Sequence, residues 1–434
     1  MLAVGARKRQ RYTFKDESQR LKDYYRAALP TSSTSAVVAF AVDPGQRLNN
    51  SLTTLTGAFI GTVSPTIDVS YQLAGNFGGF LNEVPKRLGR NEALDAAAEA
   101  LVAGYKRYRS GFREPNADLL IKHSRALTAL HRCIDVPAKA KTPETLCAVM
   151  MLPICELFMG ANKAPAMHYR GAIQFLNDRR SQNPSDDLER VVLSALRGPA
   201  LVEALVGSDM RHNRREWKSL VITGVSNGPT DTALMNQLAR LTHVVSSCRE
   251  VLRPESQKPS PNPHEVLLEL YCVQSTFIPI LNDLRNRWQQ RNKSRTSADG
   301  AQLTLEARRS HCYALRTLAS ALSLNLILNN QQTLLQGPSA AVKQHSAQLA
   351  SEILELAEQA DIYRPLGSLA MCLFLNAASV GAGDQETRER ILRKETELCK
   401  DVWGEDVMFE VLTGNMSYGT KTGQRGDPSG HWSR

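Results

Sequence analysis

The stretch TPETLCAVMMLPICELFMG, residues 142–160, decides the fold that we expect for this chain. Thr142 followed by Pro143 is typical of a helix start, because threonine caps the first turn and proline suits its first position. From there to Gly160, which favours a helix end, nearly every residue is apolar, so no polar face is left for water. Pro153 removes one backbone donor from the interior and predicts a kink. The stretch therefore predicts a central helix that neighbouring helices cover on most sides.

Helical patterns continue on both sides of this stretch. From Asn91 onward, apolar residues recur at the spacing of one half-buried helix face: Leu94, Ala98, Leu101, Tyr105 and Tyr108. Asn116 or Asp118 is suited to cap the next helix. Further helices are predicted over residues 164–180, 263–290, 304–329, 340–361, 366–380 and 385–403, with a polar loop over 291–300. The chain is therefore predicted to be all-α.

The ends of the chain have a different composition. Residues 1–30 form a basic arm, with eight Lys/Arg against three Asp/Glu before residue 27, which is half of the net charge of +10. Residues 31–90, rich in Ser and Thr, are expected to be an irregular connector, with a strand pair left open. Residues 91–415 are the predicted helical domain, and residues 416–434 a disordered tail.

The basic arm GARKRQRYTFKDES, residues 5–18, suggests three roles. Four cations within residues 7–11 could contact phosphates, but so few contacts give weak and salt-sensitive binding. RKRQR could also act as a nuclear address. A solvated, flexible terminus is the third interpretation and the one that we favour.

Several classes of chemistry lack their motifs in this sequence. Eight cysteines are spread from Cys133 to Cys399 without a CxxC pair, so we expect no structural zinc site or disulfide framework, and a reducing compartment. HExxH, P-loop, GxSxG and strand-linked GxGxxG motifs do not occur. No run of 18 apolar residues occurs, so no membrane span is expected. We therefore predict neither a metal nor a cofactor.

The motifs around the central helix resemble the middle region of fungal-specific transcription factors. In that family a Thr-Leu helix running into a Glu is followed by a His-containing segment that ends in Gly-Ala. The matching positions in this chain are Thr145, Leu146, Glu156, His168, Gly171 and Ala172. The stretches GGFLNEVPKRL, residues 78–88, and YRPLGSLAMCLFLNAA, residues 363–378, are similar to further elements of the family, and FKDES, residues 14–18, to the stretch after its zinc cluster.

One departure from the family changes the expected function. Family regulators begin with a binuclear zinc cluster of six cysteines, and this sequence has no cysteine before Cys133. The resemblance therefore implies the helical fold and does not carry over sequence-specific DNA binding. We expect residues 5–18 to be the linker of a missing head.

The candidate catalytic residues are His168, Tyr169, Arg170 and Glu156. The first three place a base, a phenol and a cation within one helical turn, and antiparallel packing of two helices would bring Glu156 toward His168 or Arg170. A buried charge pair that orients the helices is the structural alternative, and the more frequent one. In the functional interpretation, one of these side chains donates a hydrogen bond to a carbonyl group of the substrate.

The candidate ligand-binding residues are Met150, Met151, Phe158 and Met167. Thioether side chains fill irregular gaps in protein cores, and the same plasticity suits a pocket for an apolar ligand. The two interpretations are compatible, because pockets are lined by residues of the core type.

Three functions follow from these observations. The chain is a regulator without a DNA-binding head, a DNA-binding regulator whose head was truncated, or a cytoplasmic protein that acts on a small molecule in fungal secondary metabolism. We favour the third, in the form of a cofactor-independent cyclase that folds a terpenoid or polyketide polyene for an intramolecular Diels–Alder reaction. A regulator would be nuclear. A protein partner or a homodimer remains open at this stage.

Overall fold

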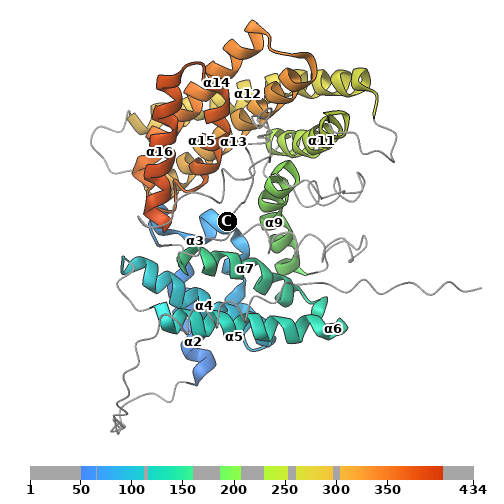
Figure 1. The fold of residues 1–434 in the computed structure, drawn as a ribbon. Helices are drawn as coiled ribbons and strands as arrows, with labels where there is room; N and C mark the ends of the chain where they lie inside the picture. Colours follow the sequence, from blue (N-terminus) through green and yellow to red (C-terminus); the bar gives the residue numbers. More distant parts are fainter. Residues whose placement is uncertain are drawn as a thin grey trace, which may run out of the picture. The chain divides into compact units, whose positions relative to one another are not determined.

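The structure is a computed structural model, and it describes seven parts of the chain: residues 50–64, 66–111, 116–159, 186–206, 229–252, 261–296 and 304–403. Throughout these parts the regular structure consists of α-helices and short 3₁₀ turns, with no strand (Figure 1). The all-α prediction is confirmed. The basic arm, the tail from residue 416 and the helix predicted over 164–180 lie outside the described residues.

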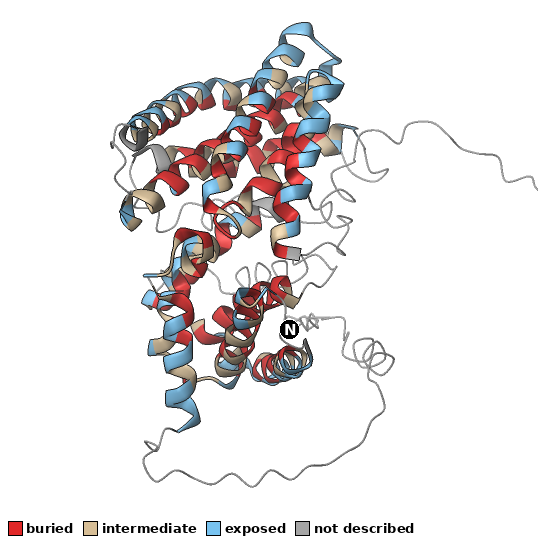
Figure 2. Ribbon diagram, turned by 90° about the vertical axis from the view of Figure 1, so that its left-hand side faces the viewer, coloured by how far each residue is buried: buried red, intermediate tan, exposed pale blue. Residues whose placement is uncertain are grey.

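The predicted central helix is α7, Pro143–Met159, and its burial is as expected from its sequence. Every residue from Glu144 to Phe158 is buried except Glu156, which is half-buried. Helices α4, Glu92–Arg109, and α5, Asn116–Asp135, pack against it and against each other. In Figure 2 the buried faces of the helices turn toward one another and the exposed faces point outward.

Polar side chains join the starts of α4 and α7. The Asn91 side chain accepts hydrogen bonds from the amides of Ala93 and Leu94, which caps α4. Its amide nitrogen donates to the Thr145 hydroxyl at 3.0 Å, and Thr142 accepts from the Thr145 amide at 3.3 Å. Thr142 therefore caps α7 as predicted. Asn91 caps α4 and, through its hydrogen bond to Thr145, also joins the start of α4 to the start of α7.

The second half of the described chain consists of longer helices. These are α11, Pro229–Leu252; α12, Pro263–Thr296; α13, Leu305–Gln336; α14, Ala340–Gln359; α15, Ala370–Gly381; and α16, Gln385–Trp403. Helix α13 contacts α11, α12, α14 and α15, and helix α9, Asp187–Val206, contacts both α7 and α11. A short helix α6, Pro137–Ala140, links α5 to α7.

Residues 51–90 differ from the expected irregular connector. They contain helix α2, Ser51–Val63, and a short helix α3, Leu73–Phe77, together with the 3₁₀ turns η1, Val69–Tyr71, η2, Gly79–Asn82, and η3, Val84–Lys86. Helix α2 buries only Phe59, Thr62 and Val63 among its residues. So short a buried face leaves little periodicity for a sequence pattern to reveal.

Distant ion pairs and hydrogen bonds hold part of this segment in place. The Arg308 guanidinium on α13 pairs with the Asp68 carboxylate, and Arg316 donates to the Gly75 carbonyl at 3.1 Å. The amide of Leu366 donates to the Ser70 carbonyl at 2.9 Å. Their partners lie more than 200 residues away in sequence, which is why local patterns missed this structure.

The prediction of a loop over residues 291–300 is also partly wrong. Helix α12 continues to Thr296, so residues 291–296 are helical. Arg291, Lys293 and Arg295 are good helix formers and favour this extension of the helix, although the segment has no apolar stripe. The helices predicted over 340–361 and 385–403 agree with α14 and α16 within two residues, whereas α15 begins four residues later than predicted.

The hairpin of α15 and α16 contains a buried carboxyl group. Glu395 on α16 is 2 % exposed, and burial raises its pKa to about 7, although a hydrogen bond with Asn376 on α15 works in the opposite direction. Cys372 and Cys399 face each other one turn further along the same hairpin. Burial therefore favours the protonated, neutral form of the Glu395 carboxyl group in the folded protein.

We predict that Glu395 makes folding depend on pH. Because its folded pKa lies above the unfolded value, its favourable contribution is complete below pH 4.5 and is lost as the pH rises through 7. Glu395→Gln mimics the protonated form, so its free energy of unfolding should exceed that of the wild type by about 3 kcal/mol more at pH 8 than at pH 4.5. Urea denaturation at the two pH values measures this difference.

The exposed Glu389 on the same helix supplies the control. Glu389→Gln should follow the wild type at both pH values. Parallel pH profiles for wild type and Glu395→Gln would show that the Glu395 carboxyl is not buried in the folded protein.

Candidate functional site

The structure places half of the predicted site residues. Glu156, Met150, Met151 and Phe158 all lie on α7. The other four lie outside the described residues: Met167, His168, Tyr169 and Arg170. The predicted approach of Glu156 to His168 or Arg170 therefore remains a prediction.

The predicted ligand-binding residues of α7 belong to the packed interior. Met150 is 2 % exposed, and Met151 and Phe158 are fully buried. Helix α4 passes close to Phe158, since a Cβ atom added at Gly104 would lie 3.3 Å from the Phe158 Cβ. In this structure the three side chains fill space between helices.

Phe158 is part of an aromatic cluster at the end of α7. Its ring centroid lies 5.0 Å from that of Tyr108 and 6.1 Å from that of Tyr105. The Tyr105 hydroxyl donates to the Tyr71 carbonyl at 3.1 Å, and the Arg109 guanidinium lies 4.1 Å from the Tyr71 ring centroid. Burial raises the pKa of both Tyr105 and Tyr108, so their hydroxyls stay protonated and act as donors.

Glu156 faces a histidine that the sequence patterns did not select. The Glu156 Oε1 atom lies 3.5 Å from Nε2 of His123, which belongs to α5 and is 3 % exposed. His123 occupies the buried stripe Leu119, His123, Ala126 and Leu130 of α5. A histidine at an apolar stripe position is a signal that could have identified it from the sequence.

The C-terminal end of α7 is contacted by the guanidinium group of Arg107. Arg107 on α4 donates to the Phe158 carbonyl at 3.0 Å, and burial lowers the pKa of its guanidinium. A guanidinium bound to the last carbonyls of a helix is favourably placed against the negative end of the helix dipole. Its role here is to end α7 and to hold α4 beside it.

The His123–Glu156 pair has the chemistry of an acid–base or hydrogen-bonding site. An imidazole N–H can donate a hydrogen bond to an oxygen that gains negative charge, and a carboxylate can accept one. The pair lies one turn beyond Pro153, on the helix that directly precedes residues 160–185, where His168, Tyr169 and Arg170 are found. Glu156 and His123 are therefore the candidate site within the described residues.

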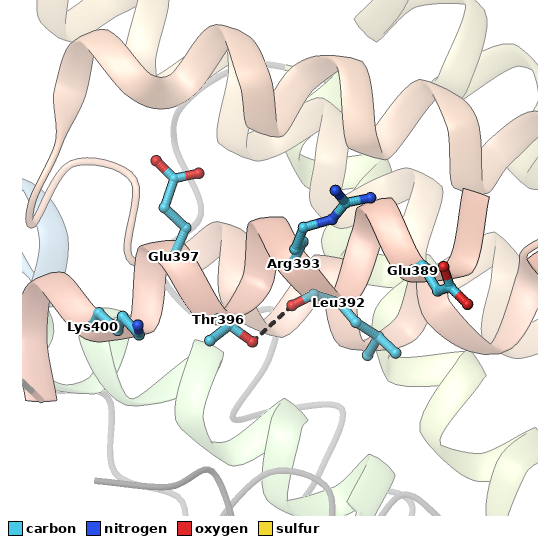
Figure 3. A pocket seen from close by; sticks show the side chains of 6 residues that line it. All are labelled: Glu389, Leu392, Arg393, Thr396, Glu397 and Lys400. Atoms are coloured by element: carbon cyan, nitrogen blue, oxygen red, sulfur yellow. Dashed lines mark hydrogen bonds between the residues drawn. The ribbon is translucent and has the colours of Figure 1, made fainter. Parts of the chain in front are cut away.

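A shallow depression on α16 is a weaker candidate. It is lined by Glu389, Leu392, Arg393, Thr396, Glu397 and Lys400 (Figure 3). All six residues come from one helix, and the Thr396 hydroxyl donates to the Leu392 carbonyl of the same helix at 2.8 Å. No second element supplies an opposing wall among these residues, so the depression does not enclose a small molecule.

Neither a metal-binding cluster nor a membrane-spanning helix is found in the described parts of the chain. No group of three or more His, Cys, Asp or Glu side chains there could hold a metal ion. None of the helices described is both long enough and apolar enough to cross a bilayer.

Comparison with known proteins gives no relative. No protein-family model, no curated protein and no solved structure matches this chain.

Truncation of Met151 tests whether the side chains between α7 and its neighbouring helices are tightly packed. Met151→Ala removes a fully buried side chain and leaves a cavity, so the free energy of unfolding should fall by about 2–5 kcal/mol. Met151→Leu keeps the volume and should cost less than about 1.5 kcal/mol. Urea denaturation measures both changes.

Ile121 is the matched surface position, because its side chain is 60 % exposed on α5. Ile121→Ala should change stability by less than about 0.5 kcal/mol. A Met151→Ala variant as stable as Ile121→Ala would contradict the packed interior.

Proposed function

We propose that this chain binds an apolar, carbonyl-bearing small molecule beside α7 and accelerates its cyclisation without a cofactor. The observation that supports the proposal is the buried His123 imidazole 3.5 Å from the Glu156 carboxylate, on a helix that is otherwise apolar. The resemblance of residues 142–172 to fungal transcription factors adds the setting of fungal secondary metabolism. The enzyme would act in the cytoplasm.

The proposed reaction is an intramolecular Diels–Alder addition of a terpenoid or polyketide polyene. Two carbon–carbon single bonds form as three π bonds become one, and no atom, proton or electron pair leaves the substrate. The protein therefore has to supply shape and polarisation only. Holding the reacting ends together contributes several kcal/mol, on the order of 7–11 in the best intramolecular cases.

Polarisation is assigned to the hydrogen-bond donors near α7. A donor on a carbonyl conjugated to the dienophile withdraws electron density and stabilises the transition state, by about 3 kcal/mol for a preorganised donor. His123, whose Nε2 atom lies 3.5 Å from the Glu156 carboxylate, is assigned as the donor among the described residues. His168, Tyr169 and Arg170 are proposed as further donors, and Met150, Met151, Phe158 and Met167 as apolar contacts of the ligand.

A second candidate function is a regulator of a fungal biosynthetic gene cluster. The observation that favours it is the complete burial of Met151 and Phe158, since side chains that pack between helices as core residues point to a protein that acts through its surface. Such a regulator would work in the nucleus through partner proteins.

Where polyketide or terpene synthase genes lie beside this gene, co-expression with them tests the proposal. The cyclised product should increase when this protein is present while transcript levels stay constant, and purified protein should convert the linear polyene. His123→Ala should lower the turnover rate by about 100-fold or more.

His131→Ala, at an exposed position of the same helix, is the control and should keep full activity. Circular dichroism confirms that both variants are folded. Product that follows transcript levels alone, with no conversion by purified protein, would exclude the enzyme and support the regulator.

A further inference from the structure

The hairpin of α15 and α16 brings two buried thiols together (Figure 1). Cys372 on α15 is 2 % exposed and Cys399 on α16 is 6 % exposed, and both are free cysteines. The Cys399 thiol lies within hydrogen-bonding reach of the Cys372 thiol. Because the two residues belong to different helices, the packing of the hairpin holds the two sulfur atoms in this position.

A second contact one turn away has the same register as the thiol pair. Asn376 lies four residues after Cys372 on α15, and Glu395 lies four residues before Cys399 on α16. Asn376 and Glu395 share a hydrogen bond. In an antiparallel hairpin, a step of one turn forward on one helix matches a step of one turn back on the other. The two contacts are therefore successive layers of one helix interface, and the thiols meet because the helices pack in this register.

Three other buried thiols of the described chain contact oxygen and not sulfur. Cys133 lies 3.7 Å from Asn91 Oδ1, Cys155 lies 3.9 Å from the Ala97 carbonyl oxygen, and Cys312 lies 3.5 Å from the Gly367 carbonyl oxygen. A disulfide needs two sulfur atoms that can approach each other. Cys372 and Cys399 meet this requirement.

A buried carboxyl group lies beside this pair and can act as a base. Glu395 is 2 % exposed, and its Oε1 atom makes no hydrogen bond to a described residue. The hydrogen bond with Cys399, burial and the nearby Glu395 carboxylate all raise the pKa of the Cys372 thiol. Because burial raises the pKa of Glu395 itself to about 7, this carboxyl group can take up a proton and release it near neutral pH.

We propose that Cys372 and Cys399 form a reversible oxidation site, at which a peroxide converts the two thiols to a disulfide that joins α15 to α16. Cys399 reacts first, because it is the more exposed of the two and because Cys372 is held as a protonated donor. Cys372 then resolves the oxidised Cys399, and Glu395 accepts its proton.

The oxidation takes place in two steps. Hydrogen peroxide oxidises the Cys399 thiol to a sulfenic acid, and one water molecule is released. The Cys372 sulfur then attacks the Cys399 sulfur, so that the S–S bond forms, the S–O bond breaks and hydroxide leaves. Glu395 passes the Cys372 proton to the hydroxide, which becomes the second water molecule. The two thiols lose two electrons and two protons, which reduce one peroxide molecule to water, and glutathione reverses the reaction by thiol–disulfide exchange.

Peptide mass spectrometry of the oxidised protein tests the site. The full chain is treated with hydrogen peroxide, unfolded in iodoacetamide, which blocks the thiols that are still free, and digested without reductant. The peptide that contains Cys399 should be linked to the peptide that contains Cys372, with a mass lower by two hydrogen atoms than the sum of the two peptides. Treatment with reduced glutathione before unfolding should return both cysteines to free thiols.

Cys147 and Cys155 are the internal control, because both are fully buried on α7. They lie eight residues apart on one helix, which is about 12 Å along its axis and beyond the reach of a disulfide. Both should be recovered as blocked free thiols after the same treatment. If Cys372 and Cys399 stay reduced, or are oxidised only to the extent of Cys147 and Cys155, the proposal is overturned.

Cys372→Ser tests the order of the two steps. Without the second thiol, the sulfenic acid at Cys399 persists, so its trapping by dimedone should exceed that in the wild type at least tenfold. In Cys399→Ser, the Cys372 thiol should stay free. Dimedone attached to Cys372 in Cys399→Ser, at the level found on Cys399 in the first variant, would contradict the assigned order.

Glu395→Gln tests the proton acceptor. The disulfide should form at least tenfold more slowly, whereas more sulfenic acid should be trapped at Cys399, because only the second step uses Glu395. Glu389→Gln, at an exposed position of the same helix, should keep the wild-type rate. Equal rates in the two variants, or less trapped sulfenic acid in Glu395→Gln than in the wild type, would overturn the role of Glu395.

Discussion

The need to cover α7 governs how the helices around it pack. A helix with a nearly complete apolar surface loses about 1.5–3 kcal/mol for each large side chain that it leaves in water, so it is stable only when other helices surround it. Helices α4, α5 and α9 all contact it. Salt bridges add to this packing at the start of α7, because Arg87 pairs with Glu144 at 3.2 Å and with Asp186 at 2.6 Å.

Burial in the helical core also constrains the few polar side chains that lie inside it. A polar group removed from water needs a partner, and each buried pair therefore fixes how two helices meet. His123 and Glu156 lie 3.5 Å apart where α5 meets α7, and a hydrogen bond between Asn376 and Glu395 joins α15 to α16. We place the proposed chemistry at the first pair because it lies on the helix that leads into His168, Tyr169 and Arg170.

The outer faces of the helices follow two different patterns. The exposed face of α16 is rich in charges, as expected of a face that remains in water, whereas α12 exposes Leu268, Tyr271 and Ile278 along its middle. Both helices bury their opposite faces in the same core. The difference therefore concerns what each outer face meets and not how the chain folds.

Patterns within one helix were readable from the sequence because they depend on residues three and four positions apart. The stripe from Leu94 to Tyr108, the cap at Thr142 and the apolar helix up to Met159 were predicted and are present. Partners from distant parts of the chain were not readable. His123 beside Glu156 and Arg308 beside Asp68 depend on how whole helices pack, and no local spacing encodes that packing. The sequence by itself thus determined the strongly periodic helices and their apolar faces, but not α2 and α3. Only the tertiary structure decided which polar groups meet, because those contacts depend on how segments distant in sequence pack against one another.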